Sequence, residues 1–87
     1  MSTDDTEHNG WKNRATWNVA LWVGNDEGLY REAVTYVQRC KAWNKKPHWS
    51  TFVVSAGLSE EKTPDGYKYL GSRLDYKALS EMLKELA

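Results

Sequence analysis

Residues 13–26, NRATWNVALWVGND, decide the fold of this chain, because their apolar side chains fit either a strand or a helix. A period of two places one face of a strand at Trp17, Val19, Leu21 and Val23. The helical period instead groups Trp17, Ala20 and Leu21 on a single face. The two interpretations differ most at Trp22, which a strand would turn away from the core and a helix would leave partly exposed.

The two ends of this segment favour the helix. Asn13 is among the residues that best cap a helix N-terminus, because its side-chain oxygen accepts a free backbone N–H. Gly24 stands near the other end, where a left-handed residue is often required. We therefore predict a helix here and keep a strand over residues 16–23 as the alternative.

Residues 26–43 predict the longest helix. Asp26 is a suitable N-cap, and Glu27 lies where the helix dipole favours a negative charge. An apolar stripe at helical spacing follows, formed by Leu29, Tyr30, Ala33, Val34, Val37 and Cys40. We expect this helix to end near Asn44, before Pro47.

Residues 50–58 predict a short third helix with Ser50 as its N-cap. Trp49 and Val54 stand at the spacing of a hydrophobic staple, and Gly57 would end the helix. Two consecutive β-branched valines leave a strand open as the alternative for this segment.

Residues 75–86 predict a final helix, with Asp75 as N-cap and a buried stripe at Tyr76, Leu79, Leu83 and Leu86. Before it, residues 63–66, TPDG, predict a β-turn, because proline presets φ and glycine accepts a positive φ. Residues 67–70 alternate and are compatible with a short extended segment. We therefore predict a mainly α fold with three or four short helices around an aromatic-rich core. The alternative is an α+β fold in which residues 16–23 form a strand.

Length and composition set further limits. At 87 residues the chain forms one domain, which we assign to residues 11–87 after a polar, disordered tail at residues 1–10. Eleven aromatic residues, five of them tryptophan, supply large rings for a small core. The formal net charge is zero, which is compatible with a homo-oligomer. No apolar run reaches the length of a signal peptide or a membrane span, so we expect a cytoplasmic protein without a membrane partner.

Few residues in the sequence are suited to catalysis. His8 lies in the expected tail, and no metal-ligating residue stands at suitable spacing around His48. Cys40, the single cysteine, falls on an apolar stripe, where a thiol behaves as a small buried hydrophobe. Its separation of eight residues from His48 is the one arrangement that keeps an enzyme hypothesis open. No phosphate loop, dinucleotide fingerprint or metalloprotease motif is present. We therefore expect no enzyme activity, no cofactor and no metal site.

The clearest candidate binding surface is residues 39–49, RCKAWNKKPHW. The segment holds four cations and no acid, and its rings are interleaved at Trp43, His48 and Trp49. Cations such as Lys45 and Lys46 can meet phosphates, while indoles stack on unpaired bases. Exposed tryptophan is equally a frequent anchor in protein interfaces, and Trp22 is a further candidate. The competing interpretation is a helix end balanced by basic residues, followed by tryptophans that pack into the core.

Residues 13–22, followed by residues 25–30, resemble a family of small uncharacterised bacteriophage and cyanophage proteins. The shared pattern reads N-R-x-T-W-x-V-x-L-W-x-x-N-D-E-x-x-Y. The turn at 63–66 and the closing helix are also similar, so the resemblance spans most of residues 11–86. It implies a phage origin and no specific activity. Small phage proteins of this kind commonly bind and redirect a host protein or block a host defence system.

We therefore expect a small non-enzymatic protein that binds a host macromolecule, with a host protein as the first expectation. Such binding would redirect host metabolism or inhibit a defence system in the host cytoplasm. The candidate partner-binding residues are Trp22, Trp43, Lys45, Lys46, His48 and Trp49. The alternative is a single-stranded nucleic-acid-binding protein that uses residues 39–49.

Overall fold

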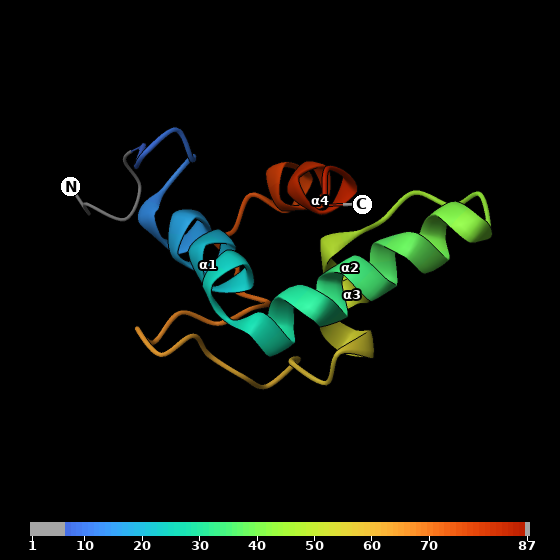
Figure 1. Ribbon diagram of the computed structural model, residues 1–87. Helices are drawn as coiled ribbons and strands as arrows, with labels where there is room; N and C mark the ends of the chain where they lie inside the picture. Colours follow the sequence, from blue (N-terminus) through green and yellow to red (C-terminus); the bar gives the residue numbers. More distant parts are fainter. Residues whose placement is uncertain (1–6, 87) are drawn as a thin grey trace.

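The computed structural model describes residues 7–86, and four helices lie within that range (Figure 1). They are α1 (Arg14–Asn25), α2 (Glu27–Ala42), α3 (Trp49–Ser55) and α4 (Tyr76–Lys84). The predicted mainly α fold is confirmed. The alternative strand over residues 16–23 is wrong, because all of these residues lie in α1. Of the predicted tail, residues 1–6 lie outside the described range.

Residues 7–10, also assigned to the tail, take part in a turn against α1. Reciprocal backbone hydrogen bonds of 2.9 Å join His8 to Trp11. The His8 ring lies on Trp17, with 4.4 Å between the ring centroids. His8 therefore already contacts the helical domain, although the predicted domain begins at Trp11.

The predicted N-caps of α1, α2 and α4 are all confirmed. They are Asn13, Asp26 and Asp75. In each case the side-chain oxygen accepts the backbone N–H three residues later, at 2.9, 3.0 and 3.1 Å respectively. These short polar side chains satisfy N–H groups that the first turn of a helix leaves without partners.

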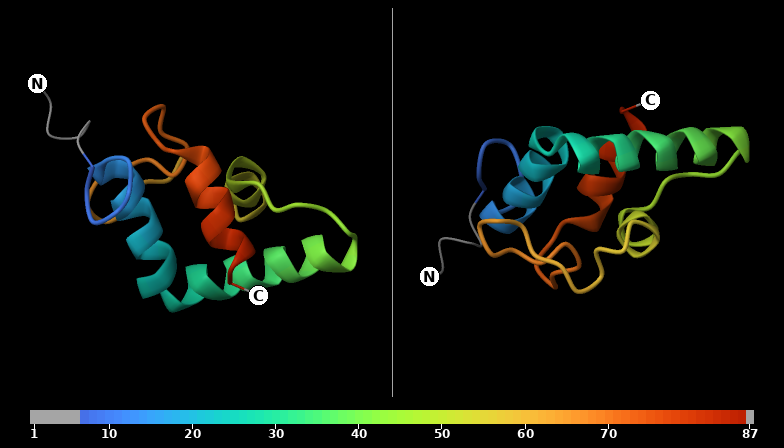
Figure 2. Two further views of the ribbon diagram at one scale, coloured as in Figure 1. Left: turned by 90° about the horizontal axis from the view of Figure 1, so that it is seen from above. Right: turned by 60° about the horizontal axis from the view of Figure 1, so that its bottom comes forward.

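Asp26 also closes the preceding helix. Its backbone N–H donates to the Trp22 carbonyl oxygen at 2.9 Å, so a single residue separates α1 from α2. The predicted role of Gly24 as a left-handed end is wrong, because α1 continues through it to Asn25. The two helices form an angular bracket, and α4 lies across its open side (Figure 2).

The third helix differs from its prediction at the N-terminus. α3 begins at Trp49, so Ser50 lies inside it, and the N-cap is His48 without a side-chain cap. The free Trp49 N–H instead donates to Ser80 Oγ of α4, at 2.9 Å. The predicted staple is also wrong, because Trp49 is fully buried while Val54 is 61% exposed.

The predicted β-turn at residues 63–66 is present, whereas the predicted extended segment at residues 67–70 is largely absent. The Gly66 N–H donates to the Thr63 carbonyl oxygen at 2.8 Å and closes the predicted β-turn, with Gly66 at φ 94°. The extended segment at 67–70 is reduced to one isolated bridge between Lys62 and Lys68, since residues 69 and 70 belong to a turn.

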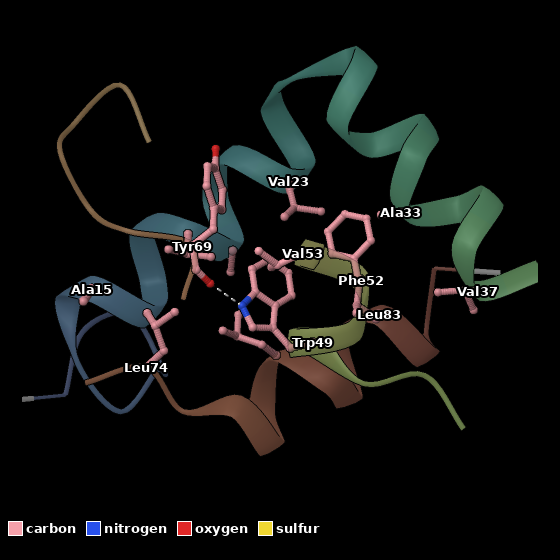
Figure 3. Packing of buried hydrophobic residues seen from close by; sticks show 13 residues of the cluster. Ala15, Val23, Ala33, Val37, Trp49, Phe52, Val53, Tyr69, Leu74 and Leu83 are labelled. Atoms are coloured by element: carbon pink, nitrogen blue, oxygen red, sulfur yellow. Dashed lines mark hydrogen bonds between the residues drawn. The ribbon is translucent and has the colours of Figure 1, made fainter. Parts of the chain in front are cut away.

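The core is one buried cluster that takes side chains from all four helices of the described range, and Trp49 lies within it (Figure 3). The Trp49 Nε1–H donates to the Tyr69 carbonyl oxygen at 2.7 Å. The Phe52 ring lies 5.4 Å from Trp49 and 5.7 Å from Tyr36, centroid to centroid. The expectation of an aromatic-rich core is confirmed.

Two tyrosines that the helical stripes place in the core lie at its margin instead. Tyr30 is 40% exposed and Tyr76 is 36% exposed, because each lies in the first turns of its helix, at the edge of the stripe. Leu79 and Leu83 of the same stripes are fully buried. In the described range, no helix combines the length and apolar character that crossing a membrane requires.

Candidate functional site

The motif of residues 13–26, which contains α1, makes several hydrogen bonds within the protein. Asn18 Nδ2 donates to the Asp65 carboxylate at 2.7 Å, and Thr63 Oγ1 donates to Asn18 Oδ1 at 2.7 Å. Trp22 Nε1–H donates to the same Asp65 oxygen at 3.0 Å. The hydrogen bonds from Asn18 and Trp22 hold the pKa of Asp65 below its ordinary value. The motif therefore ties α1 to the 63–66 turn.

The beginning of the motif makes a second internal connection. Asn13 Nδ2 donates to the Arg73 carbonyl oxygen at 2.7 Å. The Asp75 N–H donates to Thr16 Oγ1 at 3.0 Å, so the start of α1 is joined to the start of α4. Thr16 and Asn18 are buried, and their polar atoms are satisfied by these bonds. The residues at the start of α1 thus connect segments that lie far apart in the sequence.

The predicted partner-binding residues fall into two groups. Trp49 is fully buried, so its ring is not available to a partner on the surface. Trp22 is half-buried and its indole N–H is used by Asp65, which weakens its case as a docking ring. The exposed group consists of Trp43, Lys45, Lys46 and His48. Trp43 is the most exposed large hydrophobic residue in the described range, at 74%.

Trp43 is held at a fixed helix end. It is the C-cap of α2, and its backbone N–H donates to the Arg39 carbonyl oxygen at 3.0 Å. Asn44 takes a left-handed conformation, φ 56°, and the Lys45 N–H then donates to the Cys40 carbonyl oxygen at 2.7 Å. This end of α2 projects away from α1 and α4 (Figures 1 and 2).

A groove of about 490 Å³ begins at Trp43 and runs along α2. We call it the Trp43 groove; its lining residues are Glu32, Thr35, Tyr36, Arg39, Cys40, Trp43, Lys45 and Ser55. The groove was not predicted, although Glu32, Tyr36, Arg39 and Trp43 recur in the sequence at the spacing of one helical face. Among the described residues, no ion pair engages Arg39 or Lys45.

Tyr36 connects this groove to the chain before α3. Its hydroxyl accepts the His48 N–H at 3.1 Å and donates to the His48 carbonyl oxygen at 3.3 Å. Burial raises the pKa of Tyr36, so the phenol is neutral and available for both bonds. Cys40 is a buried free cysteine in the same wall, as its place on the stripe predicts. Both hydrogen bonds that join Tyr36 to His48 use backbone atoms of the histidine.

The Trp43 groove and its exposed cations lie on a small helical domain. Within residues 7–86, no group of three or more His, Cys, Asp and Glu side chains is placed to hold a metal ion. A model of a family of unknown function (DUF7249) matches residues 4–87, so the chain belongs to that family. Neither a curated protein nor a solved structure matches the chain.

Proposed function

We propose that this protein is a small, non-enzymatic phage protein that binds a host protein through the Trp43 groove. The observation that carries the proposal is the exposed Trp43 indole, which lies at a projecting helix end whose backbone is fixed by capping hydrogen bonds. A large rigid ring buries much apolar area on binding at little cost in conformational entropy, which is why tryptophan dominates interface energetics. The resemblance to small phage proteins supports the origin and the inhibitory or redirecting role.

The charges around Trp43 indicate the chemistry of the partner surface. Arg39 and Lys45 line the groove beside the indole, whereas the one acid of the lining, Glu32, lies about three turns away along α2. A suitable partner offers an apolar socket for the ring, with carboxylates around it. Cations at the rim raise the association rate more than the affinity, while the central ring sets the lifetime of the complex.

Trp43→Ala is expected to abolish the complex without loss of fold. The tagged protein is used to capture partners from a lysate of the bacterial host, and a stoichiometric host protein is expected. Removing an anchor of this kind costs about 2 kcal/mol or more, a loss of about thirtyfold in affinity. Tyr30→Ala is the matched control, because Tyr30 is an exposed ring on the same helix outside the groove. Equal capture by Trp43→Ala and the native chain would contradict the proposal.

The acid-free run of cations in residues 39–49 favours a second function, the binding of single-stranded nucleic acid. It ranks second because Trp49 is buried, which leaves Trp43 as the exposed indole of this segment. A labelled oligonucleotide titrated at low salt would bind, and the double charge reversal Lys45→Glu/Lys46→Glu would remove the binding. Oligonucleotide binding that the double variant retains would count against this function.

A further inference from the structure

A second groove, separate from the Trp43 groove, lies between residues 46–50 and one face of α4. Its volume is about 360 Å³, within the range of small-ligand sites. Its lining residues are Lys46, Pro47, His48, Trp49, Ser50, Tyr76, Lys77, Ser80, Glu81 and Lys84. The packing of α3 against α4 fixes the two walls relative to each other (Figure 2). We call this the lysine groove.

The lysine groove concentrates positive charge. Its lining includes Lys46, Lys77 and Lys84 against the single acid Glu81. All four residues are exposed, and within residues 7–86 none of them takes part in an ion pair. An anion that enters the groove therefore meets an excess of cations whose charge is not already neutralised by a neighbour.

Lys77 stands at a position that helix stability does not favour. It is the second residue of α4, where the positive end of the helix dipole disfavours a cation, and the first turn holds no acid. The side chain is exposed, so packing does not explain its presence. Lys77 lies four residues before Glu81, so the two side chains share the face of α4 that lines the groove.

Two further groups give the groove shape and hydrogen-bonding capacity. Ser80 Oγ accepts the Trp49 N–H at 2.9 Å, which fixes the hydroxyl and leaves its own proton to donate to a ligand. The Tyr76 hydroxyl donates to the Gly71 carbonyl oxygen at 3.1 Å and so orients the phenol ring. This ring is partly exposed, and it presents a flat apolar wall beside the cations.

We infer that the lysine groove binds a phosphate-bearing ligand of the nucleotide class, with its phosphate at Lys46, Lys77 and Lys84 and its base against Tyr76. Lysine ammonium groups bind phosphate as compact point charges, and the groove lining holds three lysines against one acid. Aromatic rings stack on bases of any sequence. The ligand is a free nucleotide or the end of a nucleic-acid strand, which share this chemistry.

The test is a binding titration with adenosine monophosphate, adenosine, inorganic phosphate and a short 5′-phosphorylated oligothymidylate. The expected result is binding of adenosine monophosphate, weaker binding of inorganic phosphate, and none of adenosine. A free-nucleotide site binds the monophosphate at least as tightly as the oligonucleotide, whereas a strand-end site prefers the oligonucleotide. Adenosine binding as tight as that of the monophosphate would overturn the inference.

Lys77→Glu reverses one charge of the groove and is expected to weaken nucleotide binding about tenfold or more. The helix dipole favours the new acid in the first turn of α4, whereas Asp75 and Glu81 repel it, so a thermal melt of the variant accompanies the titration. Glu81→Gln removes the opposing carboxylate and tightens binding. Lys62→Glu is the control, since Lys62 is exposed outside the groove and makes the same change in net charge.

Each variant has an outcome that decides the inference. If Lys62→Glu and Lys77→Glu weakened nucleotide binding equally, the effect would come from the net charge of the protein, and the assignment of the ligand to the lysine groove would be wrong. An acidic peptide that binds with the same dependence on Lys77 and Glu81 would overturn the phosphate assignment. Trp43→Ala is expected to leave nucleotide binding unchanged, so failure of the host-protein proposal and failure of this one are distinguishable.

Discussion

Tryptophan residues in this chain have three different environments, although the sequence presents them as one aromatic class. Trp49 fills the core, Trp22 lies half-buried with its N–H on Asp65, and Trp43 extends into solvent. Sequence periodicity alone does not predict the environments of Trp49 and Trp22, because their hydrogen-bond partners, Tyr69 and Asp65, lie twenty or more residues away. A long-range hydrogen bond has no local signature in a sequence.

The Asp65 carboxylate makes stability depend on pH. Hydrogen bonds from Asn18 and Trp22 lower its pKa in the folded state, so its contribution is complete above the unfolded value, about pH 4, and is lost as the pH falls through the folded value. The native chain is expected to lose more thermal stability than Asp65→Asn between neutral pH and about pH 3.

Thermal melts followed by circular dichroism measure this difference. Glu60→Gln is the control, because Glu60 is an exposed carboxylate in the neighbouring loop. It is expected to keep the native pH dependence. Parallel pH profiles for the native chain and Asp65→Asn would show that the hydrogen bonds on Asp65 contribute nothing to stability.

At the scale of the helices, sequence reasoning succeeds where the signal is local. Asn13, Asp26 and Asp75 are each recognisable as caps from the residues around them, and the structure confirms all three. α3 is the exception, because its first N–H is satisfied by Ser80 from another helix. A cap supplied over thirty-one residues of separation cannot be read from the segment it caps.

α3 depends on Trp49 for its place in the fold. Trp49→Ala is expected to destabilise the domain by about 3–5 kcal/mol, because it opens a cavity and removes a buried hydrogen bond. The same substitution at Trp43 is expected to change the free energy of unfolding by less than about 0.5 kcal/mol, since that ring is solvent-exposed. Urea unfolding of the two variants measures the contrast, and similar losses at both positions would refute the assignment of Trp43 to the surface.

At the scale of the whole molecule, the sequence predicts the mainly α architecture, and the structure shows which surfaces this architecture creates. The cations of residues 39–49 are visible in the sequence, and the structure confirms that Lys45 and Lys46 are exposed. The two grooves are not visible, because each is built from segments that come together only in the fold. The lysine groove joins residues 46–50 to α4, and the Trp43 groove joins α2 to Ser55.

The residues that connect α1 to the rest of the fold are different from the residues that line the two grooves. Asn18, Trp22 and Asp65 join α1 to the 63–66 turn, and none of them lines either groove. If Trp43, Arg39 and Lys45 form the proposed binding surface, they can be exchanged while the contacts of Asn18, Trp22 and Asp65 stay in place. Two proteins with the same α1 contacts would then need no common binding partner, and substitution at the end of α2 would retarget the domain.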